Sequence, residues 1–322
     1  MKALARPVTL ALSGALLAVP LAWSAAALAE EPAEVRFSVP AWPGVTVKSA
    51  LAAELLDALG YAVRQQELGS TITYEALAQN ELDAFLAAWL PAQQSMFDVT
   101  MQKGAIVDLG NNVDGARLGF AVPSYVYAAG VTSAEDLADE DVAEKFDHTL
   151  FSIEVGSGMS DTLNEAVEED IYGLGNWDLS ETSTPGMLSA VDAAIDRQEW
   201  VVFGAWTPHW MNIEYDIEYL ADTRDMWGPD GGRSDVRTLV TTAFAESNPN
   251  ATRLLDQLSF TADDQSAMIR GFSYEDREPE AVALDWLRDN PGKAKAFLDG
   301  VTTRDGEPGW PVVQQALEIP EP

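Results

Sequence analysis

The chain contains no cysteine and only two histidines among its 322 residues. The lack of cysteine excludes disulfides, thiolate metal sites and cysteine nucleophiles. The two histidines, His148 and His209, are too far apart for an H-E-x-x-H metal site, and no G-x-S-x-G segment marks a serine nucleophile. We therefore expect neither a metal nor a cofactor, and catalysis by Asp and Glu side chains is the enzymatic chemistry that stays open.

Basic residues are scarce as well. The chain has 19 Lys and Arg against 52 Asp and Glu, which gives a formal net charge of −33. A surface of this charge does not bind nucleic acid or an anionic membrane. The excess of acid is typical of adaptation to a salty medium, where counterions screen the repulsion between carboxylates. Such a field accepts a cationic or zwitterionic small molecule and disfavours an anionic one.

Long apolar runs are missing except at the N-terminus. Residues 8–22 are apolar, Lys2 and Arg6 precede them, and an A-L-A segment ends at Ala29. This order is typical of a secretory signal peptide, and the run is too short to span a bilayer comfortably. We expect residues 1–29 to be removed after export to the periplasm. The mature chain then keeps 17 basic and 52 acidic residues.

Against these absences stands a repeated tryptophan motif. Each copy places a tryptophan after an alanine and one or two residues before a proline: Ala41-Trp42-Pro43, Ala88-Trp89-Leu90-Pro91 and Ala205-Trp206-Thr207-Pro208. Proline tends to stop a strand, so an indole just before it stands at a strand end, within reach of a ligand. Three converging indoles make an aromatic box, which binds a quaternary ammonium through its methyl groups and its spread charge. We predict such a box from Trp42, Trp89 and Trp206.

The order of the expected elements predicts an α/β fold. Apolar runs and helical spacing alternate along the first part of the chain, with strands at 35–39, 61–63 and 82–88 and helices at 47–59 and 73–79. A similar set follows, with strands at 118–122, 150–155 and 200–204, a helix from 161 and another at 186–197. From about residue 251 the pattern is helical. We therefore expect two lobes, each a mostly parallel sheet flanked by helices, with a ligand cleft between them at the carboxyl ends of the strands.

Two segments have the form of an anion-binding turn. Gly44 and Val45 lead into the first helix, and Gly158 and Met159 belong to a glycine-rich turn between a strand and a helix. Free N–H groups at such helix starts receive a carboxylate, aided by the helix dipole. His209 follows Trp206 in the same loop, where it either donates to a ligand carboxylate or has a structural role.

At these residues the chain resembles the substrate-binding proteins of ABC importers for glycine betaine, choline and carnitine. The resemblance runs from about residue 35 to 310, and its most specific segment is Trp206-Thr207-Pro208-His209-Trp210. It implies a type II periplasmic binding fold that closes like a clamshell. Lobe 1 is then 34–120 with 222–318, and lobe 2 is 121–221. It also implies a monomer that captures a small solute and delivers it to a permease and ATPase complex in the inner membrane, with Trp42, Trp89 and Trp206 as the cage.

Two departures from these relatives bear on the ligand. Choline-type relatives often read Trp-Thr-Asp where this chain reads Trp42-Pro43-Gly44, so a carboxylate is missing. This favours a solute with its own carboxylate, such as glycine betaine, met by the amides near Gly44 and Val45 and by His209. A further box aromatic of some relatives is Leu118 here, which leaves Tyr125 or Trp210 as substitutes.

Other readings remain open at this point. The same fold could bind choline, carnitine, a sulfonium or a cyclic compatible solute. A different class is a secreted hydrolase or lyase that uses Asp and Glu pairs at the cleft. A third is a structural or sensory module that binds no small solute tightly.

Overall fold

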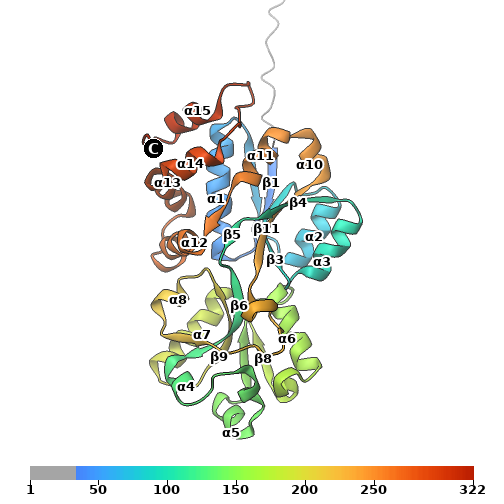
Figure 1. Ribbon diagram of the computed structural model, residues 1–322, viewed down its shortest axis with the longest axis vertical. Helices are drawn as coiled ribbons and strands as arrows, with labels where there is room; N and C mark the ends of the chain where they lie inside the picture. Colours follow the sequence, from blue (N-terminus) through green and yellow to red (C-terminus); the bar gives the residue numbers. More distant parts are fainter. Residues whose placement is uncertain (1–33) are drawn as a thin grey trace, which may run out of the picture. The chain divides into compact units, whose positions relative to one another are not determined.

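The computed structural model describes residues 34–322, so the expected signal peptide lies outside the described residues. Within 34–322 the strands form two five-stranded sheets and one two-stranded sheet (Figure 1). No helix in that range combines the length and the apolar character that crossing a bilayer requires. The α/β fold with two sheet-containing lobes, predicted from the element order, is confirmed.

The first sheet has four strands in one direction and one reversed. Its order is β2 (Ala62–Gln66), β1 (Glu34–Ser38), β3 (Ala84–Leu90), β11 (Asp235–Thr241) and β4 (Ile106–Asn111). The pairs β1–β2 and β1–β3 are parallel, whereas β11 pairs antiparallel with both β3 and β4. β11 comes from a part of the chain for which no strand was predicted.

The second sheet repeats this plan. Its order is β10 (Ile217–Tyr219), β6 (Arg117–Pro123), β9 (Val202–Thr207), β7 (Thr149–Ser152) and β8 (Asp178–Glu181). Here β6 is the reversed strand, antiparallel to β10 and β9, while β7 is parallel to β8 and β9. The small third sheet pairs β5 (Val113–Asp114) with β12 (Phe260–Thr261).

The helices of the first lobe cover both faces of its sheet (Figure 1). They are α1 (Pro43–Ala58), α2 (Ser70–Ala78), α3 (Gln94–Gln102), α10 (Thr242–Ser247), α11 (Pro249–Gln257), α12 (Ala262–Ile269), η4 (Arg270–Tyr274), α13 (Pro279–Asp289), α14 (Pro291–Phe297) and α15 (Gly309–Ala316). α1 begins at Pro43, four residues before the predicted start, because proline suits the first helical position, where no donor is needed. It ends before Gly60, whose φ of 92° is open to glycine.

The second lobe carries shorter helices. They are α4 (Ser124–Ala128), η1 (Ala134–Ala138), α5 (Glu140–Ala143), η2 (Glu144–Phe146), α6 (Gly158–Glu168), η3 (Ile171–Asn176), α7 (Thr184–Asp196) and α8 (Met211–Glu214), with α9 (Pro229–Gly232) on the returning segment. α6 and α7 flank the sheet on its two sides (Figure 1). α6 starts at Gly158, three residues before the prediction, because the Ser157 side chain caps it.

The chain passes between the two sheets twice, and the two passages pair with each other. Arg117 and Arg233 form an isolated antiparallel bridge, and Ser234 N–H donates to the carbonyl of Ala116 at 2.9 Å. Both reversed strands, β6 and β11, adjoin these passages. β6 spans the lobe boundary expected at residue 120 and lies wholly in the second sheet.

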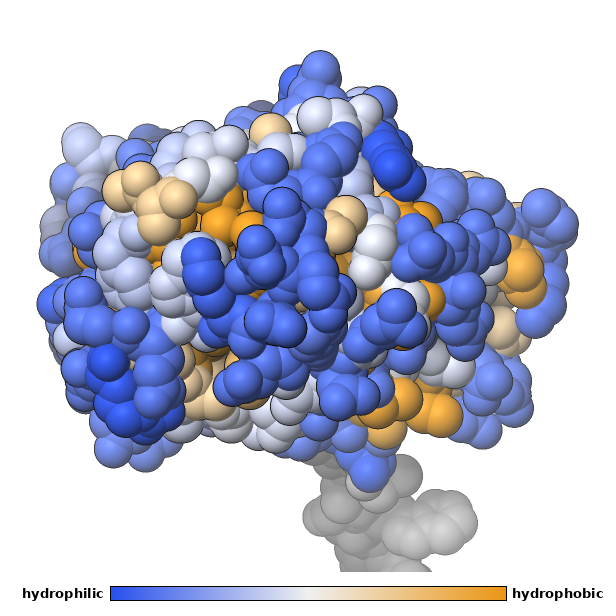
Figure 2. All heavy atoms as spheres, turned by 90° about the horizontal axis from the view of Figure 1, so that it is seen from below, coloured by the Kyte–Doolittle hydropathy of each residue, from blue (hydrophilic) through white to orange (hydrophobic). Residues whose placement is uncertain are grey.

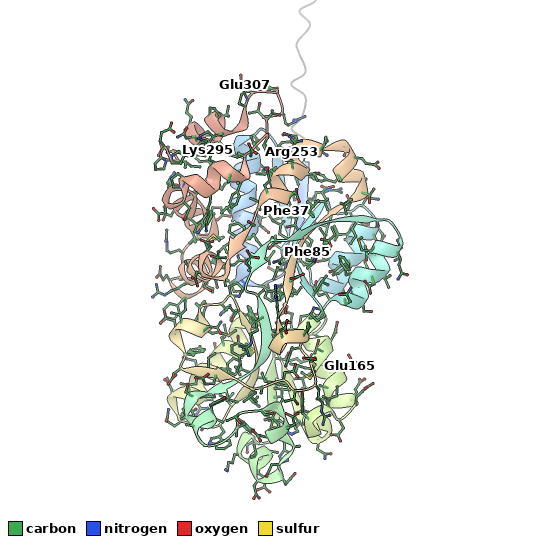
Figure 3. The ribbon with its side chains drawn as sticks, viewed as in Figure 1. Phe37, Phe85, Glu165, Arg253, Lys295 and Glu307 are labelled. Carbon is green, nitrogen blue, oxygen red and sulfur yellow. The ribbon has the colours of Figure 1, made fainter. Side chains whose placement is uncertain are left out.

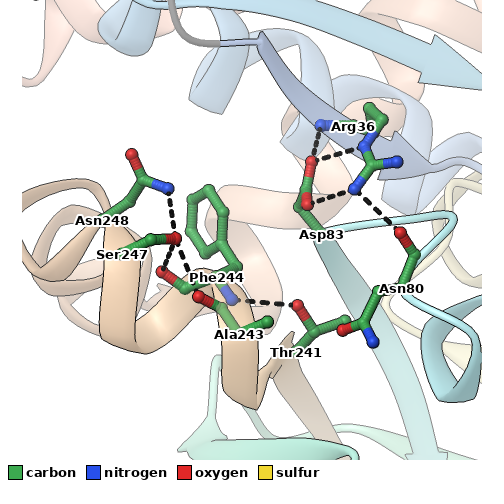
Figure 4. A network of polar contacts seen from close by, with 8 residues as sticks. All are labelled: Arg36, Asn80, Asp83, Thr241, Ala243, Phe244, Ser247 and Asn248. Carbon is green, nitrogen blue, oxygen red and sulfur yellow. Dashed lines mark hydrogen bonds and ion pairs between the residues drawn. The ribbon is translucent and has the colours of Figure 1, made fainter.

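The first lobe is stabilised by an apolar core and by an ion pair between β1 and the residue before β3. Phe37 and Phe85 lie inside it, both fully buried (Figure 3). Arg36 of β1 binds the Asp83 carboxylate through its side chain and its backbone N–H, at 2.7–2.8 Å (Figure 4). The face seen in Figure 2 is largely hydrophilic, with scattered apolar residues, as the high charge predicts.

Candidate functional site

A small cavity of about 50 Å³ lies between elements of the two lobes. The first lobe contributes Trp42, Gly44, Val45, Lys48, Ala87, Trp89, Ala92, Gln93, Val236 and Gln265. The second lobe contributes Leu118, Ile153, Ser157, Gly158, Met159, Trp206 and Pro208. Seven of the eight residues predicted from the sequence line this cavity, and His209 is the exception.

The three indoles of the motif converge here, although they reach the cavity differently from the prediction. Trp89 and Trp206 are the penultimate residues of β3 and β9, so they lie within the strands rather than in the loops after them. Each strand ends just before a proline joined by a cis peptide bond. Trp42 precedes α1 as its N-cap residue. Trp42 and Trp206 are only 8% and 7% exposed, so both indoles are buried where they line the cavity.

The N-terminus of α1 leaves its donors free for a ligand. No side chain of residues 34–322 caps it, and its first turn contains no acidic residue. The first N–H groups of a helix have no partner within the helix, so those of Gly44 and Val45 can receive an anion at the cavity wall. Gln265 of α12 donates to the carbonyl of Gly44 at 2.9 Å and thereby holds this turn against the rest of the lobe.

The N-terminus of α6 faces the same cavity from the second lobe. The Ser157 hydroxyl accepts from the N–H of Ser160 at 3.1 Å, which caps the helix. Gly158 lies against the first lobe, because a Cβ at this position would stand 2.8 Å from the carbonyl oxygen of Ala92. Only glycine permits so close an approach between the lobes.

His209 lies behind the cavity wall. It is fully buried, and its ring packs edge to face against Trp206, with centroids 4.9 Å apart. Its Nδ1 accepts from the N–H of Met211 at 3.2 Å, while Nε2 has no partner among the described residues. Burial lowers the pKa of His209 to about 3, so the ring is neutral at physiological pH.

Neither expected substitute for the missing aromatic reaches the cavity. Leu118 itself lines it, on β6 and paired with Trp206 of β9. The Tyr125 hydroxyl donates to the carbonyl of Glu199, away from the site. Trp210 donates from Nε1 to the Ser273 hydroxyl at 2.8 Å. The box is therefore built of three indoles and an aliphatic wall.

Polar contacts join the two lobes near the cavity. Trp42 donates from Nε1 to the Glu154 carboxylate, which follows β7 of the second lobe. Arg270 of the first lobe also binds the Glu214 carboxylate of the second lobe at 2.8 Å. With the Trp210–Ser273 bond, these contacts describe a conformation in which the two lobes have closed on each other.

Lys48, Glu154 and Gln265 are among the residues at or beside the site that were not predicted. Lys48 had a sequence signal, because it is the one basic residue in the apolar α1 and stands one turn after Gly44. Glu154 and Gln265 had none. They lie 112 and 221 residues from the partners they bind, and such pairings follow only from the folded arrangement.

Known proteins resemble this chain in sequence and in fold. Residues 33–289 match the family described as the substrate binding domain of ABC-type glycine betaine transport systems. The glycine betaine/carnitine transport binding protein GbuC of Listeria monocytogenes is 30% identical over 180 residues, which are 56% of this chain and 59% of that protein. The chain thus spans about three fifths of the length of that relative.

Two solved structures extend the likeness over most of the chain. An ABC-transporter choline binding protein in complex with choline has a TM-score of 0.85 and 30% identity, and the match covers 88% of this chain and 98% of that one. Lactococcal OpuAC, closed on glycine betaine, has a TM-score of 0.74 and 26% identity, with 82% and 99% covered. The family match spans well over half of the sequence, and the chain belongs to the family of substrate-binding domains of ABC-type glycine betaine transport systems.

Proposed function

We propose that this protein is the solute receptor of an ABC importer and closes its two lobes on a small quaternary ammonium compound, glycine betaine first among them. The observation that carries the proposal is the convergence of three indoles, from both lobes, on one cavity. Indole faces suit trimethylammonium, which spreads its charge over methyl groups and has no N–H to donate. Relatives solved with choline and with glycine betaine share the fold.

The residues take complementary roles in this proposal. Trp42, Trp89 and Trp206 surround the ammonium methyl groups. The N–H groups of Gly44 and Val45, at the uncapped start of α1, meet the carboxylate. Those of Gly158 and Met159 add polar contacts from the second lobe. His209 supports the Trp206 ring from behind rather than touching the solute, because it lies off the cavity wall.

The work of such a receptor is differential binding to the closed state, without a chemical step. A hydrolase with an Asp or Glu pair at this cavity is disfavoured, because no carboxylate stands among the residues that line it in the described chain. We further propose a periplasmic monomer, exported by a signal peptide cleaved after Ala29. It would deliver the solute to a permease and ATPase complex in the inner membrane.

The direct test is tryptophan fluorescence of the mature protein at high salt, titrated with glycine betaine, choline, carnitine and dimethylsulfoniopropionate. We expect a saturable change with glycine betaine and a weaker response to choline. A response to choline alone would keep the fold and change the ligand. An unchanged fluorescence with all four compounds would refute the proposal that the protein is a quaternary ammonium receptor.

A further inference from the structure

A lysine stands in the wall of a cavity suited to a cation. Lys48 is only 1% exposed and lines the same cavity as the three indoles. It is the one charged side chain among the lining residues of the described chain. A second positive charge in this place would repel choline, so its presence needs a chemical reason.

The position of the ammonium is fixed by a buried amide. Lys48 Nζ donates to Asn112 Oδ1 at 2.5 Å. The Asn112 amide nitrogen donates to the carbonyl of Leu86 at 3.0 Å and to the Thr238 hydroxyl at 2.8 Å. Because these two bonds occupy its NH₂ group, the carbonyl end of the amide can only face the lysine. Strands β3 and β11 thus hold the lysine head in place through Asn112.

Within the described part of the chain, this ammonium has one hydrogen-bond acceptor and no counterion. An ammonium has three N–H donors, and the bond to Asn112 is the only one Lys48 makes through its side chain within residues 34–322. Burial alone lowers the pKa of Lys48 to about 7, and no carboxylate, arginine or histidine of the described chain contributes to the shift. A buried cation without a partner is costly, and a carboxylate supplied by the ligand would remove that cost.

We propose that Lys48 binds the carboxylate of the solute and so selects zwitterionic betaines over purely cationic solutes. This inference rests on the proposed function and assigns the ligand selection to one side chain. Lys48 stands one helical turn after Gly44, so its ammonium and the free N–H groups at the start of α1 can meet the same carboxylate. Choline carries a hydroxyl in place of a carboxylate and offers the ammonium no counterion.

Binding should then be coupled to a proton. A bound carboxylate stabilises the charged form of Lys48, so the complex takes up a proton when the pH exceeds about 7. Affinity for glycine betaine should fall as the pH rises above 7, whereas affinity for choline should stay level or rise. The choline series on the same protein is the internal control.

The decisive variant is Lys48→Met, which keeps the length of the side chain and removes its charge. Calorimetric titrations with glycine betaine and choline would be compared with those of Lys103→Met, which removes the same charge from an exposed site outside the cavity. We expect Lys48→Met to weaken the affinity for glycine betaine by about 30-fold. The affinity for choline should stay unchanged or increase. Lys103→Met should leave the ratio of the two affinities unchanged.

An unchanged ratio in Lys48→Met would overturn this inference while the proposed function stands. A wild-type protein that binds neither solute would overturn both. If Lys48→Met does not fold, the pH series on the wild type decides. A fall in glycine betaine affinity between pH 7 and 9, absent for choline, supports the role of Lys48, and parallel profiles overturn it.

Discussion

The two lobes bring helix N-termini of different character to one cavity. α1 of the first lobe starts without a side-chain cap and without an acid in its first turn, and a buried lysine follows one turn later. α6 of the second lobe is capped by Ser157 and carries Asp161 in its first turn. The backbone N–H groups at the start of α1 are therefore free to bind a ligand. At the start of α6, the N–H of Ser160 already donates to the Ser157 hydroxyl. We therefore propose that the anionic end of the solute lies against the first lobe.

The buried bases of the two lobes differ in the same way. Lys48 of the first lobe faces the cavity, whereas His209 of the second lies behind Trp206. Burial lowers the pKa of both. In our proposal the lysine therefore acts on the ligand, and the histidine supports an indole.

The largest expected effect on affinity is at Trp206, the indole that the second lobe supplies. We expect Trp206→Ala to weaken the affinity for glycine betaine by at least about 30-fold, because a desolvated cation–π contact contributes about 2 kcal/mol. The measurement is a calorimetric titration, with circular dichroism to confirm folding. Trp200→Ala removes a half-buried indole of the same lobe outside the cavity and serves as the control. Equal affinity in Trp206→Ala and the wild type would contradict the box.

Closure of the second lobe onto the first depends on Gly158. In Gly158→Ala the new methyl group would stand 2.8 Å from the carbonyl oxygen of Ala92. We expect affinity to fall about tenfold, while the melting temperature of the ligand-free protein changes little, since the clash exists only when the lobes are closed. Gly292→Ala, where a Cβ meets nothing within 4 Å, is the matched control. An unchanged affinity would show that ligand binding does not require the close approach of Gly158 to Ala92.

His209 should make the protein sensitive to acid. Its pKa is about 3 in the folded protein and near 6.5 when unfolded, so the unfolded chain binds more protons between these values. Stability from this group is nearly complete at pH 7.5 and is lost as the pH falls, by about 1.4 kcal/mol between pH 7.5 and 5.5. Urea unfolding of the wild type and of His209→Phe at pH 7.5 and 5.5 tests this. Equal losses in the two proteins would assign acid sensitivity to other groups.

The cap of α6 gives the smallest effect on binding. We expect Ser157→Ala to lower the free energy of unfolding by about 1 kcal/mol and to change ligand affinity less than threefold. Ser183→Ala removes the corresponding cap of α7, away from the cavity, and should cost about as much stability. A strong loss of ligand affinity in Ser157→Ala, without such a loss in Ser183→Ala, would show that the start of α6 contributes to ligand binding. The difference proposed between the two lobes would then be wrong.

Local sequence signals were sufficient for three strands of each five-stranded sheet and for seven of the residues that line the cavity, whereas β4, β8, β10 and β11 were not predicted. Prolines and glycines located the ends of the strands, and the shared motif singled out Trp42, Trp89 and Trp206. The reversed strand β11 was missed, because its place between β3 and β4 is set by pairing across the sheet. Lys48 was overlooked because a lysine in a helix is usually exposed, and its burial depends on Asn112, 64 residues away.

The double passage between the lobes also has a consequence for the order of folding. β11 lies between β3 and β4, yet it is reached only after the chain has run through the whole second lobe. During synthesis the first sheet therefore stays incomplete until residue 241 has left the ribosome. The bridge between Arg117 and Arg233 brings the ends of the inserted segment together, so folding of the second lobe shortens the loop that β11 must close. Pairing of β11 with β3 and β4 thus costs less loop-closure entropy once the second lobe has folded.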